Sequence, residues 1–162
     1  DEDDIEVTGN SVTSNANLPG EDSLHFQIDC TVKGFVKKVG PNYILQLGKL
    51  TGDQLLLDKD DLERNVDVYM PYPRGYEYVI DVTIPEGYEA KGLDKFNNNI
   101  DNETGSLISS ATLEGNVIRV RFRKYYKNHY ELKDNWDKMI DFIQPGAEFL
   151  TREVLLKKKR GS

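Results

Sequence analysis

A run of strict alternation between apolar and polar residues near the start of the chain constrains the fold most. The apolar members are Leu24, Phe26, Ile28, Cys30 and Val32, and a polar residue follows each of them. Because successive side chains of a strand point to opposite faces, this alternation predicts a strand with one face buried. We therefore expect a chain built mainly from β-strands.

The same alternation recurs further along the chain, with turn residues between the segments. Gly40-Pro41-Asn42 is a turn sequence, so residues 24–39 and 43–50 are predicted to pair as a hairpin. Residues 91–105 are rich in Asn, Asp and Gly, which predicts a long loop. The remaining strands are expected at residues 66–70, 76–84, 107–113, 118–122 and 154–156.

One segment has the periodicity of a helix. Apolar residues between Leu132 and Leu150 recur at a spacing that places them on one side of a helix. The pattern predicts a helix over 134–144, which Pro145 and Gly146 end or kink because proline lacks a backbone donor and clashes with the preceding turn. Consecutive strands with short turns and one late helix predict a mainly β fold, an antiparallel β-sandwich of six to eight strands with one C-terminal helix.

Negative charge is concentrated at the start of the chain. The net charge is -7, and residues 1–22 contain Asp and Glu but neither Lys nor Arg. Such charge runs are usually solvated, so residues 1–21 are predicted to be an acidic flexible arm or linker and residues 22–160 a β-sandwich-like accessory domain. The chain begins without Met, which we interpret as a sign of a fragment or a processed form.

Charge and hydropathy argue against two classes of partner. Beyond residue 22 the acidic and basic side chains balance, and the basic run Lys157-Lys158-Lys159-Arg160 is short. Nucleic-acid binding requires a broader positive patch. No apolar run approaches the roughly 20 residues of a membrane-spanning helix. We predict neither a nucleic-acid partner nor membrane insertion.

Few residues have the spacing of a catalytic or metal site. A nucleophilic Cys30 would need a histidine base, but His25 has the opposite strand parity, so Cys30 is predicted to be a core thiol. The acidic run at residues 58–61 lacks the glycine and the distal glutamate of a calcium loop. We predict no catalytic residue, no cofactor and no metal ion, although the many carboxylates leave an unrecognised two-carboxylate enzyme site as a further hypothesis.

Aromatic residues are the one group that suggests binding. Tyr125, Tyr126 and Tyr130 lie close together in the sequence, beside His129. Exposed tyrosines on a β-sandwich can stack on sugars or form a protein interface. The three tyrosines are therefore candidate ligand or interface residues, and the alternative is that they pack over sheet edges and the helix.

Several short motifs, in the same order, resemble those of a known domain. They include Gly40–Leu45, Asp67–Pro71, Ile84–Tyr88 and Val154–Lys158. With them the chain resembles, over about residues 22–158, the C-terminal domain of uncharacterised function from bacterial multidomain transglutaminase-like proteins. The catalytic residues of that family belong to the preceding papain-like domain, and no position of this chain matches them.

The resemblance implies a non-catalytic accessory domain that assists a transglutaminase-like or protease core by docking or substrate binding. The implied partner is the catalytic domain of the same parent chain, and the implied location is the periplasm or the cell surface. A different class of function remains open, a glycan- or protein-binding β-sandwich module that uses the exposed tyrosines.

Overall fold

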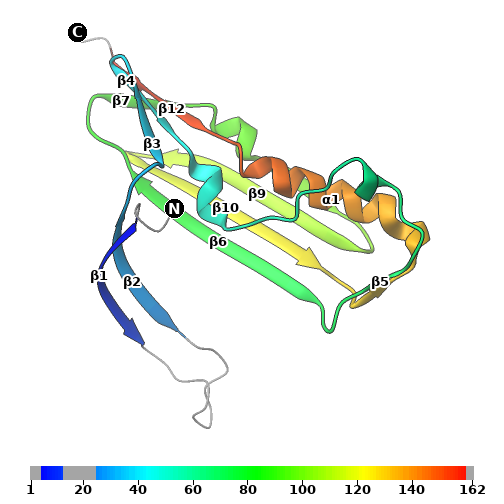
Figure 1. Ribbon diagram of the computed structural model, residues 1–162. Coiled ribbons are helices and arrows are strands. Elements are labelled where there is room, and N and C mark those ends of the chain that lie inside the picture. The colour runs from blue at the N-terminus through cyan, green and yellow to red at the C-terminus, as the bar shows by residue number, and fades with distance from the viewer. Residues whose placement is uncertain (1–4, 13–24, 160–162) are drawn as a thin grey trace. The chain divides into compact units, whose positions relative to one another are not determined.

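The computed structural model describes residues 5–12 and 25–159, which form two compact units, Asp1–Val36 and Lys37–Ser162 (Figure 1). The chain is mainly β, with several antiparallel sheets and one C-terminal α-helix, and the described residues form no closed barrel. The predicted fold class is confirmed. The structure adds short strands that the sequence pattern did not reveal.

The first unit is a two-stranded antiparallel ribbon. Strand β1 (Ile5–Val12) pairs with β2 (Phe26–Val32), and a bulge shifts the register between Val7 and Gly9. Strand β1 lies inside the segment predicted as a flexible arm, while residues 1–4 and 13–21 of that arm fall outside the described residues.

The hairpin predicted from residues 24–39 and 43–50 is shorter than expected. Strand β2 pairs with β1, and the hairpin is made by β3 (Val36–Val39) and β4 (Asn42–Leu45). Gly40 has a φ of 58° at its turn, a left-handed conformation that glycine adopts without strain. The alternation was identified correctly, but it carries no information about which strand is the neighbour.

The largest sheet belongs to the second unit and has the order β6-β10-β9-β8. Strands β9 (Gly105–Glu114) and β10 (Val117–Tyr126) form a hairpin, and β6 (Arg74–Thr83) pairs with β10 along its full length. The strands predicted at residues 76–84, 107–113 and 118–122 are therefore confirmed.

The prediction of a long loop at residues 91–105 is wrong. The segment contains the end of β7 (Tyr88–Lys91), the 3-10 helix η4 (Leu93–Phe96) and strand β8 (Asn98–Asp101). Its side chains are short and polar, but Phe96 is fully buried and the Asn98 amide donates to the Ser109 hydroxyl on β9. Tertiary packing thus overrides the weak local strand signal.

A second four-stranded sheet has the order β3-β4-β12-β7. Its central strand β12 (Val154–Lys158) pairs with both β4 and β7, which confirms the last predicted strand. A short ladder joins β5 (Val68–Tyr69) to β11 (Tyr130–Glu131). Three further 3-10 helices are η2 (Leu47–Thr51), η3 (Asp60–Leu62) and η5 (Lys133–Asn135).

Helix α1 (Trp136–Phe149) packs on β8 and β9 and lies across the largest sheet (Figure 1). It continues through Pro145, so the predicted end of the helix at residue 144 is wrong. The turn beyond Pro145 places Ala147 and Phe149 in the core, and this burial offsets the hydrogen bond that proline cannot make. No helix among the described residues is long and apolar enough to cross a membrane.

An aromatic cluster between α1 and the sheet forms the centre of the core. Phe149 lies edge-to-face against Phe122 at 4.8 Å and against Phe96 at 5.2 Å between ring centroids. Gly105 lets the helix approach closely, because a Cβ there would lie 2.3 Å from Cζ of Phe142. This packing fixes α1 over β9 and β10 and thereby shapes the cavity at the far end of β10.

Candidate functional site

A cavity of about 380 Å³ lies where α1, β5, β6 and β10 meet. Its lining combines apolar side chains with cationic and aromatic ones. The residues that line it are Asp53, Gln54, Leu55, Arg64, Val68, Tyr69, Met70, Arg74, Tyr76, Lys124, Tyr126, Trp136, Met139 and Ile143. A concave site that brings apolar walls and convergent polar groups together is a common form of a ligand site.

Lys124 is the most unusual residue of this lining. It follows Phe122 on the inner face of β10, and only 1% of its surface is exposed. Its Nζ donates to Oε1 of Gln54 at 3.2 Å and lies 5.3 Å from the Tyr126 ring centroid. None of the ion pairs found among the described residues includes it. Burial lowers the pKa of Lys124 from its ordinary 10.5 to about 8.

Three further polar groups surround the same space. Burial raises the pKa of Tyr126 to about 12, so its hydroxyl stays protonated at neutral pH. The guanidinium of Arg64 lies 4.7 Å from the Trp136 ring centroid, a cation–π distance. Arg74 joins the lining from the start of β6. Asp53 is the acidic residue of the lining, and the three cationic residues Arg64, Arg74 and Lys124 outnumber it.

The sequence contains a signal for the inward position of Lys124. On the strand expected at residues 118–122, Ile118, Val120 and Phe122 have one parity, and the same parity continues to Lys124 and Tyr126. A lysine at an inward position of a central strand is rare, because burying its charge is costly. The parity alone would have placed Lys124 and Tyr126 inside and Tyr125 outside.

The structure does not bring the three candidate tyrosines together. Tyr125 points outward, and its ring covers Gly75, where a Cβ would lie 2.3 Å from Cε1 of Tyr125. Tyr126 points inward and packs edge-to-face on Phe142 at 5.1 Å between ring centroids. Because neighbours on a strand face opposite sides, adjacency in sequence separates these two rings.

Tyr130 lies apart from the other two candidates, on β11. Its hydroxyl donates to the Asp67 carboxylate, and this hydrogen bond lowers the pKa of Asp67. Tyr69 lies directly opposite Tyr130 in the β5–β11 ladder. The exposed fractions of the Tyr130 and Tyr69 surfaces are 48% and 71%, so this second pair is the exposed one.

The β1–β2 ribbon carries an apolar face of a different kind. The register places the apolar residues of both strands on one side and Glu6, Gln27, Asp29 and Thr31 on the other. The prediction that Cys30 is a core thiol is wrong, because Cys30 is exposed. The apolar face comprises Ile5, Val7, Val12, Phe26, Ile28, Cys30 and Val32.

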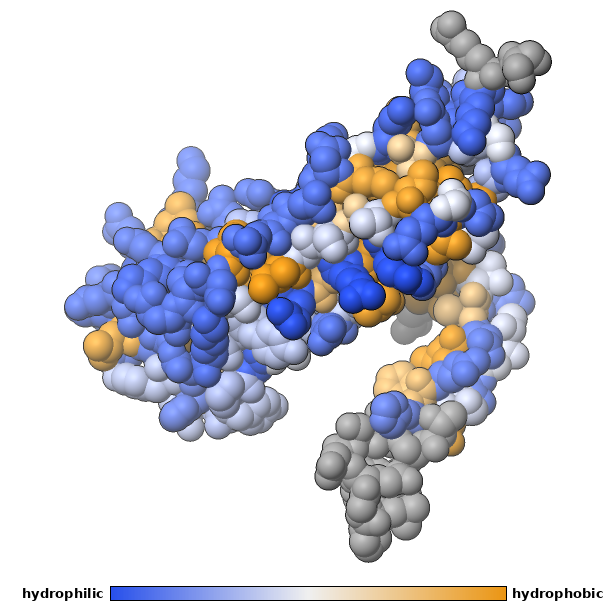
Figure 2. Space-filling model, turned by 180° about the vertical axis from the view of Figure 1, so that it is seen from behind, coloured by the Kyte–Doolittle hydropathy of each residue, from blue (hydrophilic) through white to orange (hydrophobic). Residues whose placement is uncertain are grey.

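This apolar face is open to solvent throughout the ribbon. The exposed fractions of its larger hydrophobic side chains run from 36% at Val32 to 70% at Val12, and Figure 2 shows apolar side chains at the surface of the ribbon. A two-stranded hairpin is marginally stable by itself in water. An uncovered apolar face on such an element is typical of an interaction surface.

Charge distinguishes the two units as well. In residues 1–36 Lys33 is the only basic side chain, against eight Asp and Glu, which gives a net charge of -7. Since the whole chain also has a net charge of -7, residues 37–162 are neutral. Residues 1–36 therefore carry the whole charge imbalance of the chain, and two of their acidic residues, Glu6 and Asp29, lie on the ribbon strands.

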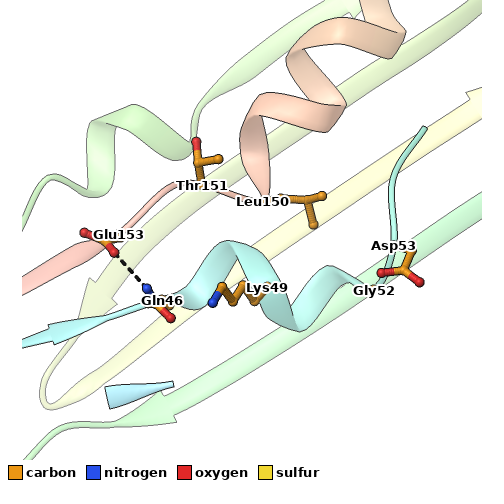
Figure 3. A pocket seen from close by; sticks show the side chains of 7 residues that line it. All are labelled: Gln46, Lys49, Gly52, Asp53, Leu150, Thr151 and Glu153. Carbon is orange, nitrogen blue, oxygen red and sulfur yellow. Dashed lines mark hydrogen bonds between the residues drawn. The ribbon is translucent and has the colours of Figure 1, made fainter. Parts of the chain in front are cut away.

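A further hollow of about 520 Å³ lies beside η2 and the end of α1 (Figure 3). At one end of this hollow the Gln46 amide donates a hydrogen bond to the Glu153 carboxylate at 3.0 Å. Asp53 lies at the other end of the hollow, away from Glu153 (Figure 3). The two carboxylates therefore do not form a pair. Among the described residues no group of three or more His, Cys, Asp or Glu side chains could hold a metal ion.

Comparison with known proteins identifies the central part of the chain. Residues 46–146, more than half of the sequence, match the family DUF3858, which is described as a domain of unknown function with a solved structure. No curated protein matches the chain, and no solved structure matches it. The matched segment includes the largest sheet, most of α1 and every residue of the cavity around Lys124, and it excludes the ribbon.

Proposed function

The chain belongs to the DUF3858 family of domains of unknown function, and from this premise we propose that it is a non-catalytic accessory domain. In this proposal the β1–β2 ribbon docks the domain onto another protein domain. The observation that carries the proposal is the open apolar face of the ribbon. Burying such a face contributes about 25 cal/mol per Å² of apolar surface, which the isolated ribbon does not gain.

The net charge of residues 1–36 defines the chemistry of the partner. An apolar strip on the partner would cover Phe26, Ile28 and their neighbours. Lysine or arginine side chains around that strip would match the net charge of -7 of residues 1–36. Such complementarity speeds association and selects the partner, so the proposed complex weakens as salt rises.

We propose the catalytic domain of the same parent polypeptide as that partner. The support is the resemblance of residues 22–158 to the C-terminal domain of transglutaminase-like proteins. Under this proposal the domain positions a transglutaminase-like or protease core or helps it hold substrate, and the parent protein acts in the periplasm or at the cell surface.

A calorimetric titration of the separately produced transglutaminase-like core with this chain tests the docking proposal. The double variant Phe26→Asp, Ile28→Asp places two charges on the apolar face and should weaken the Kd at least tenfold. The matched control Gln27→Asp, Thr31→Asp adds the same charge to the opposite face and should bind nearly as well as the wild-type chain. Equal binding by both variants, or no contact with the wild-type chain, would contradict the proposal.

A second candidate function is glycan or protein binding through tyrosines. Of the residues predicted for it, Tyr130 has the favourable setting, because the exposed ring of Tyr69 lies opposite it. Ring stacking on a sugar requires such an accessible aromatic surface. Titration with a set of neutral oligosaccharides, followed by NMR, should perturb β5 and β11 if this function holds, and Tyr69→Ala should remove the effect.

A further inference from the structure

The buried amine of Lys124 has too few partners for a charged group. Among the described residues its polar partners are one neutral amide oxygen, from Gln54, and the face of the Tyr126 ring. An ionised group taken out of water is costly unless a counter-charge compensates it, and buried charges are normally paired. Lys124 instead lines a cavity that opens beside it.

The rest of the lining adds further groups that favour an anion. The arginines Arg74 and Arg64 line the same space, and arginine donors match the two oxygens of a carboxylate. The Tyr126 hydroxyl makes no hydrogen bond among the described residues, and its raised pKa keeps it protonated as a donor. These groups come from β6, β10 and the segment after η3, so the fold brings donors from distant parts of the sequence to one cavity.

The walls of the cavity favour an apolar or planar group attached to that anion. Trp136, Met139 and Ile143 line it from α1, and Tyr69 and Tyr76 line it from the strands. A volume of about 380 Å³ lies at the lower end of the range for small-molecule pockets. The space therefore suits a compact ligand with one charged end.

We propose that this cavity binds a small molecule in which a compact aromatic or aliphatic group carries a carboxylate. Lys124 is the central anion-binding residue, and Arg74 and the Tyr126 hydroxyl are the supporting donors. A monoanion fits better than a phosphate dianion, because desolvating a second negative charge is costly and one deeply buried cation faces it. The proposal is independent of docking by the ribbon.

NMR titration of the full chain with phenylacetate tests the site. Phenylacetate should bind with a Kd of about 1 mM or below and perturb the backbone signals of residues around Lys124 and Trp136. The neutral analogue phenylacetamide should bind at least tenfold more weakly. Stronger perturbation by inorganic phosphate than by phenylacetate would overturn the assignment to a carboxylate.

Matched variants connect the binding to Lys124. Lys124→Met keeps the length of the side chain and removes the charge, and it should weaken phenylacetate binding at least tenfold. Lys95→Met removes an exposed lysine on η4, outside the cavity, and should leave the Kd unchanged. Arg74→Gln, on an exposed position of β6, gives a second test that does not alter the core and should weaken binding severalfold. Unchanged affinity in both cavity variants would overturn the proposal.

Discussion

Strands β2 and β10 have nearly the same alternation of apolar and polar residues, yet one is open and the other is buried. On β10 the inward residues Ile118, Val120 and Phe122 are fully buried. On β2 the corresponding residues Phe26 and Ile28 expose 65% and 53% of their surfaces. Alternation therefore reveals that a strand has an apolar face, but it does not reveal what covers that face.

The position of each strand in its sheet explains the contrast. Strand β10 lies between β6 and β9, and α1 with its aromatic residues covers the inner face of that sheet. Strand β2 has one neighbour, β1, in a sheet of two strands. Stability of a sheet comes from several strands and a covered face together, so the two-stranded ribbon lacks the support that the largest sheet has.

Removing one phenylalanine from each region should give the largest difference. Phe142→Ala empties a fully buried site on α1 and should lower the free energy of unfolding by about 3–5 kcal/mol. Phe26→Ala removes a solvent-exposed ring from the ribbon and should change it by no more than about 0.5 kcal/mol. Urea unfolding of both variants checks this, and a comparable loss from Phe26→Ala would show that the ribbon face is covered in the free chain.

The sequence predicted well those features that depend on neighbouring residues. Alternation located β6, β9, β10 and β12, and helical spacing located α1. The shared inward direction of Ile118, Val120 and Phe122, all fully buried, follows from strand geometry alone. The helix predicted from the sequence is shorter than α1, because proline disfavours a helix interior and the sequence does not reveal that Phe149, beyond Pro145, is buried.

Features that depend on distant parts of the chain could not be predicted in the same way. The neighbour of β2 turned out to be β1, in a segment with little apolar periodicity, and the exposure of Cys30 follows from that pairing. The cavity around Lys124 joins residues between 53 and 143, and no local spacing connects them. The apparent tyrosine cluster failed as a cluster because strand parity, rather than distance in sequence, decides which rings share a face.

Lys124, on the inner face of β10, allows the effect of burial to be tested within the largest sheet. A lysine whose folded pKa lies at about 8, below its ordinary 10.5, binds fewer protons in the folded than in the unfolded state between these pH values. Its burial therefore costs stability fully below about pH 8, and the cost disappears as pH rises towards 10.5. Lys124→Met should raise the free energy of unfolding at pH 7 by on the order of 2 kcal/mol.

Urea unfolding of both proteins between pH 7 and pH 10 measures this effect. The advantage of Lys124→Met should shrink steadily above pH 8. Ionisation of Tyr126 lowers the free energy of unfolding only above pH 10, because the folded pKa of Tyr126 is raised to about 12. Tyr126 is present in both proteins, so it does not change the difference between them. A constant advantage over the whole range would mean that the charge of Lys124 is already compensated, which would also weaken the case for an anion site.

The smallest effect is expected on the outer face of the largest sheet, where the side chains of β10 are partly exposed to fully exposed. Arg119 on β10 donates from Nε and Nη2 to the two carboxylate oxygens of Asp81 on β6, each at 2.8 Å, and this hydrogen-bonded pairing lowers the pKa of Asp81. A lowered carboxyl pKa contributes stability above its ordinary value of 3.8 and loses it as pH falls through the folded pKa.

Arg119→Gln should therefore raise the pKa of Asp81 towards its ordinary value and lower stability slightly at neutral pH. The loss should fade at high salt, since exposed ion pairs are screened. NMR titration of the Asp81 carboxyl measures the pKa. Arg121→Gln is the matched control, because Arg121 acts on the Asp81 pKa through its charge alone, whereas Arg119 also donates hydrogen bonds to Asp81. If both variants shifted the Asp81 pKa equally, the general positive charge of β10 would hold it low, and the cross-strand pair would contribute nothing specific.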